Sequence, residues 1–140
     1  MKLVDLNVLV YAVDSTARHH PAAAGWLDHA LAGSETIGLP TAVAVGFIRL
    51  TTNPRIMVSP LTPGAAVEIV RTWLTRPNVT APQPTARHYH LIAEMLDATG
   101  VGGNLVSDAH LAALAIEHGA ALVTFDSDFA RFPSLVTVQL

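Results

Sequence analysis

Apolar and polar residues alternate along this chain with two different periods. Short apolar segments with the length of buried strands occur at residues 2–5, 35–40, 78–82, 121–125 and 136–140. Between them lie longer segments, 22–33, 41–52, 63–77, 85–100 and 105–119, in which apolar residues recur every three or four positions. Such a period is typical of a helix with one buried face. The pattern therefore predicts short strands that alternate with helices.

One segment, residues 6–13, leaves both strand and helix open, because it is apolar almost throughout. Leu6, Val10 and Val13 lie four and three residues apart, which favours a helix. Elsewhere the helix boundaries are marked by threonines that can act as N-caps and glycines that can end the last turn. The expected caps are Thr41, Thr62 and Thr85, and the expected terminators are Gly33, Gly100 and Gly119.

Strands that alternate with helices of this length are typical of a parallel sheet covered by helices on both faces. We therefore expect a three-layer α/β/α domain whose central, mostly parallel sheet has four to five short strands. No linker, internal repeat or low-complexity segment divides the chain, so residues 1–140 are expected to form a single domain.

Composition narrows the class of protein. The chain is 51% hydrophobic with a mean hydropathy of +0.41, enough for one core, but charged residues, Pro or Gly interrupt every apolar stretch. Asp5, Asn7 and Asp14 also break the apolar N-terminal segment and argue against a signal peptide. We expect a soluble, cytoplasmic protein without a membrane span. Because the chain has no cysteine, its possible metal ligands are carboxylates and seven histidines.

Charge gives no overall attraction to nucleic acid, since eight basic and eleven acidic residues leave a net charge of −3. Any contact with RNA or DNA must therefore use a local basic patch. The basic residues are all arginines except Lys2. Arginine suits forked recognition of phosphate, but codon composition explains the same bias equally well.

Four carboxylates stand at positions where chemistry is common. Asp5 and Asp126 each follow a predicted strand, and the carboxyl ends of parallel strands meet at one edge of a sheet. Asp108 lies early in a predicted helix on its apolar face, although an acid there can simply complement the helix dipole. Asp128 forms an Asp-Ser-Asp sequence with Asp126, which can also be a turn cap.

Together, these carboxylates would raise one another's pKa unless a cation neutralised them. Oxygen ligands alone select a hard divalent ion, Mg²⁺ or Mn²⁺, and such an ion is suited to phosphodiester hydrolysis. No Walker loop, GxGxxG motif or Ser-His-Asp spacing is present. A phosphatase with an Asp-x-Asp nucleophile after its first strand, or a response-regulator receiver with a late lysine, does not match the order of residues here.

Three stretches, KLVDLNVLVYA, RLTTNPR and GNLVSDAHLAALAIEHGAALVTFDSDFARF, resemble PIN-domain ribonucleases, specifically the VapC-type toxins of toxin–antitoxin pairs. The resemblance covers essentially the whole chain and implies a Mg²⁺-dependent endoribonuclease (Mn²⁺ is the other candidate ion), a homodimer and a cognate antitoxin that blocks the acidic pocket. It further implies that Asp5, Asp108 and Asp126 bind the metal and that Asp128 lines the same pocket. Polar neighbours that would support them are Asn7, Asn104 and Thr124.

One position departs from that family. Members usually carry a glutamate on the helix that aligns with TAVAVGFIRL, and this chain has Gly46 there. The glycine predicts close packing against the helix backbone, and we expect Asp128 to compensate for the missing acid. Arg49, one turn further along, is expected to meet an RNA phosphate or an antitoxin carboxylate, or simply to be solvated. The alternative function is an inactive PIN-like module that only binds RNA or antitoxin.

The histidines are not expected to bind the metal, because none of the seven shows a ligand spacing with the acids. His118, at the end of a predicted helix, is most simply a partner of the helix dipole.

Overall fold

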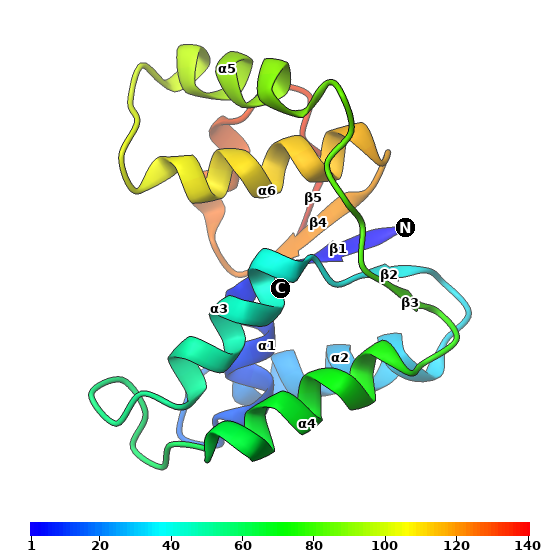
Figure 1. Ribbon diagram of the computed structural model, residues 1–140, viewed down its shortest axis with the longest axis vertical. Helices are drawn as coiled ribbons and strands as arrows, with labels where there is room; N and C mark the ends of the chain where they lie inside the picture. Colours follow the sequence, from blue (N-terminus) through cyan, green and yellow to red (C-terminus); the bar gives the residue numbers. More distant parts are fainter.

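Five short parallel strands form the centre of the molecule, in a computed structural model that describes residues 1–140 (Figure 1). They are β1 (Lys2–Val4), β2 (Ile37–Gly38), β3 (Val79–Thr80), β4 (Ala121–Thr124) and β5 (Thr137–Gln139). Their order across the sheet is β3-β2-β1-β4-β5, and every neighbouring pair is parallel. The predicted parallel sheet is confirmed, and its first strand lies at its centre.

Six helices connect the strands, together with a short 3-10 helix, η1 (Ser127–Arg131). They are α1 (Leu6–Val13), α2 (His20–Ala32), α3 (Thr41–Thr51), α4 (Pro63–Leu74), α5 (His88–Thr99) and α6 (Leu105–Glu117). Figure 1 shows α5 and α6 on one side of the sheet and α1 to α4 on the other. The three-layer α/β/α architecture is therefore confirmed, and the ambiguous segment 6–13 is a helix. None of these helices has the length and apolar character needed to cross a bilayer.

Packing against the two central strands explains why α6 is so rich in alanine. Leu3 of β1 and Leu122 of β4 are completely buried. On α6, Ala109, Ala112 and Ala115 are also completely buried, and their small side chains let the helix approach the sheet closely. This close approach carries the first turn of α6 to the carboxyl edge of the sheet.

Two of the three predicted threonine caps are wrong. The prediction at Thr62 is confirmed, since its Oγ1 accepts a hydrogen bond from the Ala65 N–H at 3.2 Å. Thr41 is already the first residue of α3, and Pro40, with no side-chain acceptor, occupies the cap position. Thr85 lies before the start of α5, where its Oγ1 accepts a hydrogen bond from the Arg87 N–H at 3.2 Å and its hydroxyl donates to Glu117. Thr85 therefore holds the turn that leads into α5 and does not cap the helix itself.

Candidate active site

Asp5 joins the central strand to the first helix. It follows β1 directly and is the N-cap of α1, where Oδ1 accepts a hydrogen bond from the Leu6 N–H at 2.6 Å. Its second oxygen, Oδ2, accepts one from the Thr124 hydroxyl at 2.6 Å. The residue is only 8% exposed. Both the backbone and a neighbouring strand thus hold this carboxylate in one orientation.

The Thr124 hydroxyl connects the ends of β1 and β4. Besides donating to Asp5, its Oγ1 accepts hydrogen bonds from Asn7 Nδ2 at 3.2 Å and from the Asp126 N–H at 2.9 Å. Asn7 Oδ1 in turn accepts one from the Phe125 N–H at 3.3 Å. The structure therefore brings Asn7 and Thr124 together with Asp5 and Asp126, as polar neighbours at one edge of the sheet.

Asp126 and Asp128 have different local roles. Asp126 caps η1, because its Oδ1 accepts a hydrogen bond from the Asp128 N–H at 2.8 Å, so the turn-cap interpretation is right for this residue. Its Oδ2 has no hydrogen bond within the protein and remains available as a ligand. Asp128 forms an ion pair with Arg131 at 2.6 Å, and its side chain is 67% exposed.

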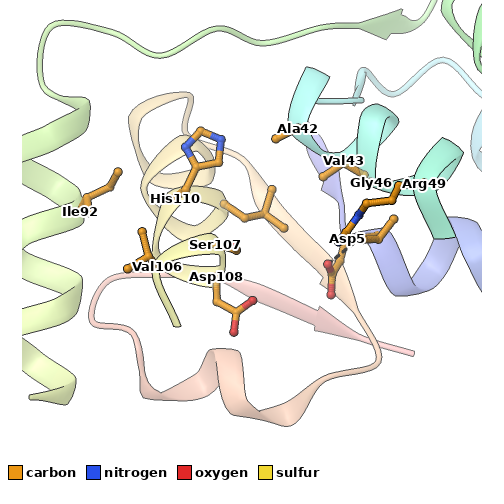
Figure 2. Close-up of a pocket in the computed structure, with 12 residues that line it drawn as sticks. Asp5, Ala42, Val43, Gly46, Arg49, Ile92, Val106, Ser107, Asp108 and His110 are labelled. Carbon is orange, nitrogen blue, oxygen red and sulfur yellow. Dashed lines mark hydrogen bonds between the residues drawn. The ribbon is translucent and has the colours of Figure 1, made fainter. Parts of the chain in front are cut away.

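Asp108 faces Asp5 across a cavity of about 460 Å³ between α3, α5 and α6, called here the main cavity (Figure 2). Its lining residues are Asp5, Leu6, Ala42, Val43, Gly46, Arg49, Ile92, Val106, Ser107, Asp108, His110 and Leu111. Asp126 and Asp128 are not among them. Asn104 is also outside this set: it lies exposed at the N-cap of α6 and makes no side-chain capping bond.

Electrostatic repulsion connects three of the acids. Burial raises the pKa of Asp5 above its usual value, the hydrogen bonds from Thr124 and Leu6 oppose that shift, and the charges of Asp108 and Asp126 raise the pKa further. Burial also raises the pKa of Asp108. The charge of Asp126 adds to this shift, Arg131 opposes it, and Asp128 raises the pKa again. Asp126 therefore acts on both of the other carboxylates.

This set of donors suits a hard divalent cation in its chemistry. All of its ligands are carboxylate oxygens, and a positive charge would relieve the repulsion that raises the pKa of Asp5 and Asp108. No group of three or more acidic or histidine side chains is arranged closely enough to enclose an ion by itself. Mg²⁺ does not need such an enclosure, because it usually keeps several waters beside one or two carboxylates.

Gly46 leaves no acidic side chain on the α3 wall of the main cavity. A Cβ atom at this position would lie 2.9 Å from Leu6 Cδ2, so the predicted close packing against the helix backbone is confirmed. The nearest acid in sequence, Glu35, cannot take the missing position. It pairs with Lys2 Nζ at 2.9 Å, at the start of β1, whereas Asp5 follows the end of that strand.

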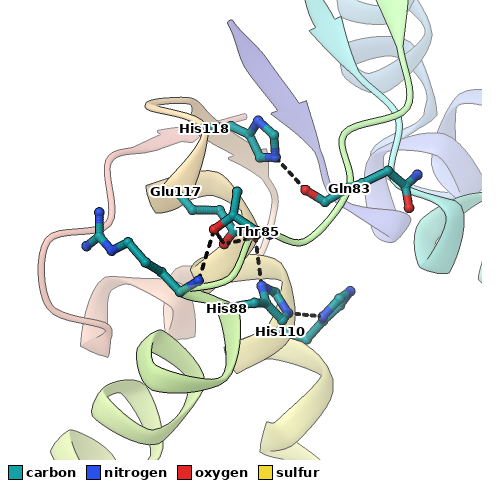
Figure 3. A network of polar contacts seen from close by, with 7 residues as sticks. Gln83, Thr85, His88, His110, Glu117 and His118 are labelled. Atoms are coloured by element: carbon teal, nitrogen blue, oxygen red, sulfur yellow. Dashed lines mark hydrogen bonds and ion pairs between the residues drawn. The ribbon is translucent and has the colours of Figure 1, made fainter.

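A buried polar chain beside the main cavity was missed at the level of sequence (Figure 3). Glu117 Oε1 lies 2.8 Å from His88 Nδ1, and His88 Nε2 lies 2.8 Å from His110 Nδ1. The histidine spacing was compared only with the acids of the predicted metal site, whereas His88 and His110 bond to each other and His88 bonds to Glu117. The available signal was helical spacing: His88 shares the buried face of α5 with Leu91 and Met95.

The pKa shifts in this chain follow from its bonds. Burial alone would raise the pKa of Glu117, but hydrogen bonds from Thr85 and His88 hold it below its usual value. Burial lowers the pKa of His110, the nearby His88 lowers it further, and Glu117 opposes the shift. Glu117 is therefore an anion at neutral pH, inside the protein, with its side chain 1% exposed.

Comparison with known proteins gives consistent results. The family model described as PIN domain matches residues 2–135. Ribonuclease VapC37 of Mycobacterium tuberculosis is 47% identical over 94% of this chain and 92% of its own length, and Ribonuclease VapC33 of the same species is 36% identical over 96% and 94%. Among solved structures, VapBC2 from Rickettsia felis, bound to a promoter DNA fragment, has a chain with a TM-score of 0.69 at 20% identity, covering 99% of this chain and 97% of that one.

Proposed function

Because this chain belongs to the PIN-domain family, among its VapC-type members, we propose that it is a Mg²⁺-dependent endoribonuclease and the toxin of a type II toxin–antitoxin pair. The proposal treats residues 1–140 as one PIN domain that acts in the cytoplasm. The observation that supports it most strongly is the convergence of Asp5, which follows β1, with Asp108 of α6 and Asp126, which follows β4. They lie close enough that the charge of Asp126 raises the pKa of both other acids. Separate elements have no structural need to bring three acids to one sheet edge.

In this proposal Asp5, Asp108 and Asp126 hold the metal together with bound waters, because the three acids do not enclose an ion by themselves. Mn²⁺ is the alternative ion. When bound, the ion supplies a water of lowered pKa and offsets charge on the phosphate. Thr124 keeps Asp5 in its ligand orientation by donating to Oδ2. Asp126 offers Oδ2, since Oδ1 is already used in capping η1.

Arg49 is the basic residue best placed to hold the RNA backbone. It lines the main cavity, and the arginine ion pairs in the structure involve only Arg71 and Arg131. A guanidinium without a carboxylate partner is free to make forked hydrogen bonds to a phosphate. We propose that it does so when RNA is bound, and that an antitoxin carboxylate competes for it.

The partners in the proposal are RNA, a cognate antitoxin and a second copy of the chain. The relatives are named VapC ribonucleases, and the structural neighbours include VapBC from Salmonella typhimurium bound to DNA. An antitoxin segment would neutralise the enzyme by occupying the main cavity. The second copy of the chain is proposed because the resemblance to VapC-type toxins implies a homodimer.

A second candidate function follows from Gly46. Leu6 packs over this position, and the only acids that line the main cavity are Asp5 and Asp108. The second candidate is therefore a PIN-like module that binds RNA or antitoxin without cutting. Binding without cleavage at every Mg²⁺ and Mn²⁺ concentration would support this alternative.

Cleavage of total cellular RNA tests the main proposal. We expect cuts by the wild type in Mg²⁺, loss of cutting in EDTA, and a decrease of at least about a hundredfold in Asp5→Asn, because removing one stabilising charge from a reaction centre has effects of that order. Asn keeps the size and capping ability of Asp5, so a folding defect is not expected. Asp28→Asn, exposed on α2, is the matched control. Equal cutting in all samples would refute the proposal.

Asp128 is proposed to compensate for the absent glutamate, since its charge already raises the pKa of Asp108. Mg²⁺ binding measured by calorimetry should then weaken by about tenfold in Asp128→Asn, which removes this charge. Unchanged Mg²⁺ affinity and unchanged cleavage would show that Asp128 serves only its ion pair with Arg131.

A further inference from the structure

The buried chain Glu117–His88–His110 ends at the wall of the main cavity and has no part in the metal site. Its inner end is anchored firmly: Glu117 Oε2 accepts hydrogen bonds from the Thr85 hydroxyl at 2.7 Å and from the Thr85 N–H at 3.2 Å. Its middle, His88, has a side chain only 3% exposed. Its outer end, His110, lines the main cavity together with Asp5 and Asp108.

When both rings are neutral, the bonds of the chain determine which nitrogen of each ring carries the proton. A carboxylate only accepts hydrogen bonds, so His88 Nδ1 must donate to Glu117. With both rings neutral, His88 Nε2 is then an acceptor, and His110 Nδ1 must donate to it. In this tautomer the remaining nitrogen, His110 Nε2, is a hydrogen-bond acceptor. It has no partner among the hydrogen bonds of the protein.

As an acceptor, His110 Nε2 can form a hydrogen bond only with a donor group of a nucleic acid. Phosphate oxygens are acceptors themselves and cannot bond to it. The ribose 2′-hydroxyl is a donor, occurs in every nucleotide of RNA, and lies next to the backbone phosphate. It is also the group by which a protein distinguishes RNA from DNA. A phosphate at the proposed metal site of Asp5 and Asp108 would bring that hydroxyl into the same cavity as His110.

We propose that His110 Nε2 accepts a hydrogen bond from the 2′-hydroxyl of bound RNA and so selects RNA over DNA, with His88 and Glu117 as positioning residues. This inference rests on the proposed ribonuclease function and adds a determinant of specificity to it. His88 and Glu117 never touch the substrate. They act by fixing the ring orientation and the tautomer of His110, as outer partners do for metal-bound histidines.

Binding of two fluorescein-labelled probes by anisotropy tests the proposal. One probe is a short random-sequence RNA pool, and the other is the same pool with 2′-fluoro sugars, which lack the hydroxyl donor. All proteins carry Asp126→Asn and are assayed in Mg²⁺, so that cutting is suppressed. We expect tighter binding of RNA than of 2′-fluoro RNA by about three- to tenfold, the effect of one hydrogen bond.

Variants separate recognition from folding. In His110→Phe, which keeps a ring of similar size, the preference for RNA should fall to about one. In His110→Gln, whose side-chain oxygen can replace Nε2 as acceptor, it should be partly restored. In His88→Leu the preference should fall as well, while His90→Leu is the matched control, because His90 is exposed on the same helix and pairs only with Glu94. Thermal unfolding of each variant verifies the fold.

An unchanged RNA preference in folded His110→Phe overturns the inference, as does a wild-type background that binds both probes equally. In either case, Mg²⁺-dependent cutting of RNA by the protein with an intact Asp126 would leave the proposed function standing. If that protein neither cuts nor binds RNA, the function and the inference fall together.

Discussion

At the scale of single residues, the carboxylates of the site concentrate negative charge in a way that lowers the stability of the fold. Asp5 and Asp108 both have a raised pKa because burial and the other acids disfavour their ionised forms. The hydrogen bond from Thr124 partly offsets the rise in the pKa of Asp5. Without a cation, such a cluster works against folding at neutral pH, which gives the site a measurable effect on stability.

The raised pKa of Asp108 determines how its contribution to stability changes with pH. An acid whose folded pKa lies above its usual value of 3.8 stabilises the fold below that value, and this contribution is lost as pH rises through the folded pKa. In EDTA at pH 7, Asp108→Asn should therefore raise Tm by about 2 °C, a small shift because Asp108 is only half-buried and solvent screens its charge. The gain should disappear near pH 3.

Calorimetric unfolding with and without Mg²⁺ measures this prediction. Added Mg²⁺ should raise the Tm of the wild type more than that of Asp108→Asn, because the variant has lost a ligand. Asp97→Asn, exposed on α5, is the control for removal of one negative charge. A lower Tm for Asp108→Asn in EDTA would contradict the repulsion inferred from the structure.

At the scale of elements, local signals succeed where the helix end is exposed. Thr62 and Pro63 start α4 as the sequence predicts, and Gly100 ends α5 with a left-handed φ of 67°, a conformation that glycine adopts easily. At Thr85 the same kind of signal is misleading. Its Oγ1 accepts a hydrogen bond from the Arg87 N–H in the turn that precedes the helix, its hydroxyl donates to Glu117, and α5 begins only at His88.

Two exposed threonines test capping directly. Thr62→Ala should lower the free energy of unfolding by about 1 kcal/mol, because the Ala65 N–H loses its acceptor. Thr41→Ala should change it by less than about 0.5 kcal/mol, since Thr41 makes no capping bond. Urea titration of both variants measures the difference. Equal losses would mean that Thr41 also contributes to the start of α3.

At the scale of the whole molecule, the parallel sheet brings the two ends of the chain together. β1 and β4 pair in register, with Leu3 opposite Leu122, so that Asp5 and Asp126 emerge at the same edge. The hydroxyl of Thr124 then donates to Asp5, which lies 119 residues away in sequence, and so bridges the ends of the two strands. The site therefore exists only when the entire sheet is assembled.

Thr124→Val tests this bridge. The variant keeps the shape of the side chain but removes the bonds to Asp5, Asn7 and the Asp126 N–H, and we expect a loss of about 2 kcal/mol in the free energy of unfolding. Thr51→Val is the control, since Thr51 is equally buried but bonds only the Phe47 carbonyl within its own helix. Urea titration should show the smaller loss for Thr51→Val, and the reverse order would contradict the bridge.

The sequence by itself determined the features that depend on neighbouring residues. Its periods predicted the alternation of strands and helices, and the positions of Asp5 and Asp126 just after two apolar strands predicted acids at one sheet edge. Local periodicity carries this information because a strand or helix is selected by which of its own residues are apolar.

Only the tertiary structure decided the contacts between distant segments. It placed Leu6 over Gly46, Arg131 against Asp128, and His110 beside the main cavity. It also linked Glu117 to His88 and Thr85 across α5 and α6. These pairings depend on how helices pack on the sheet, and no local pattern records which side chains will then meet.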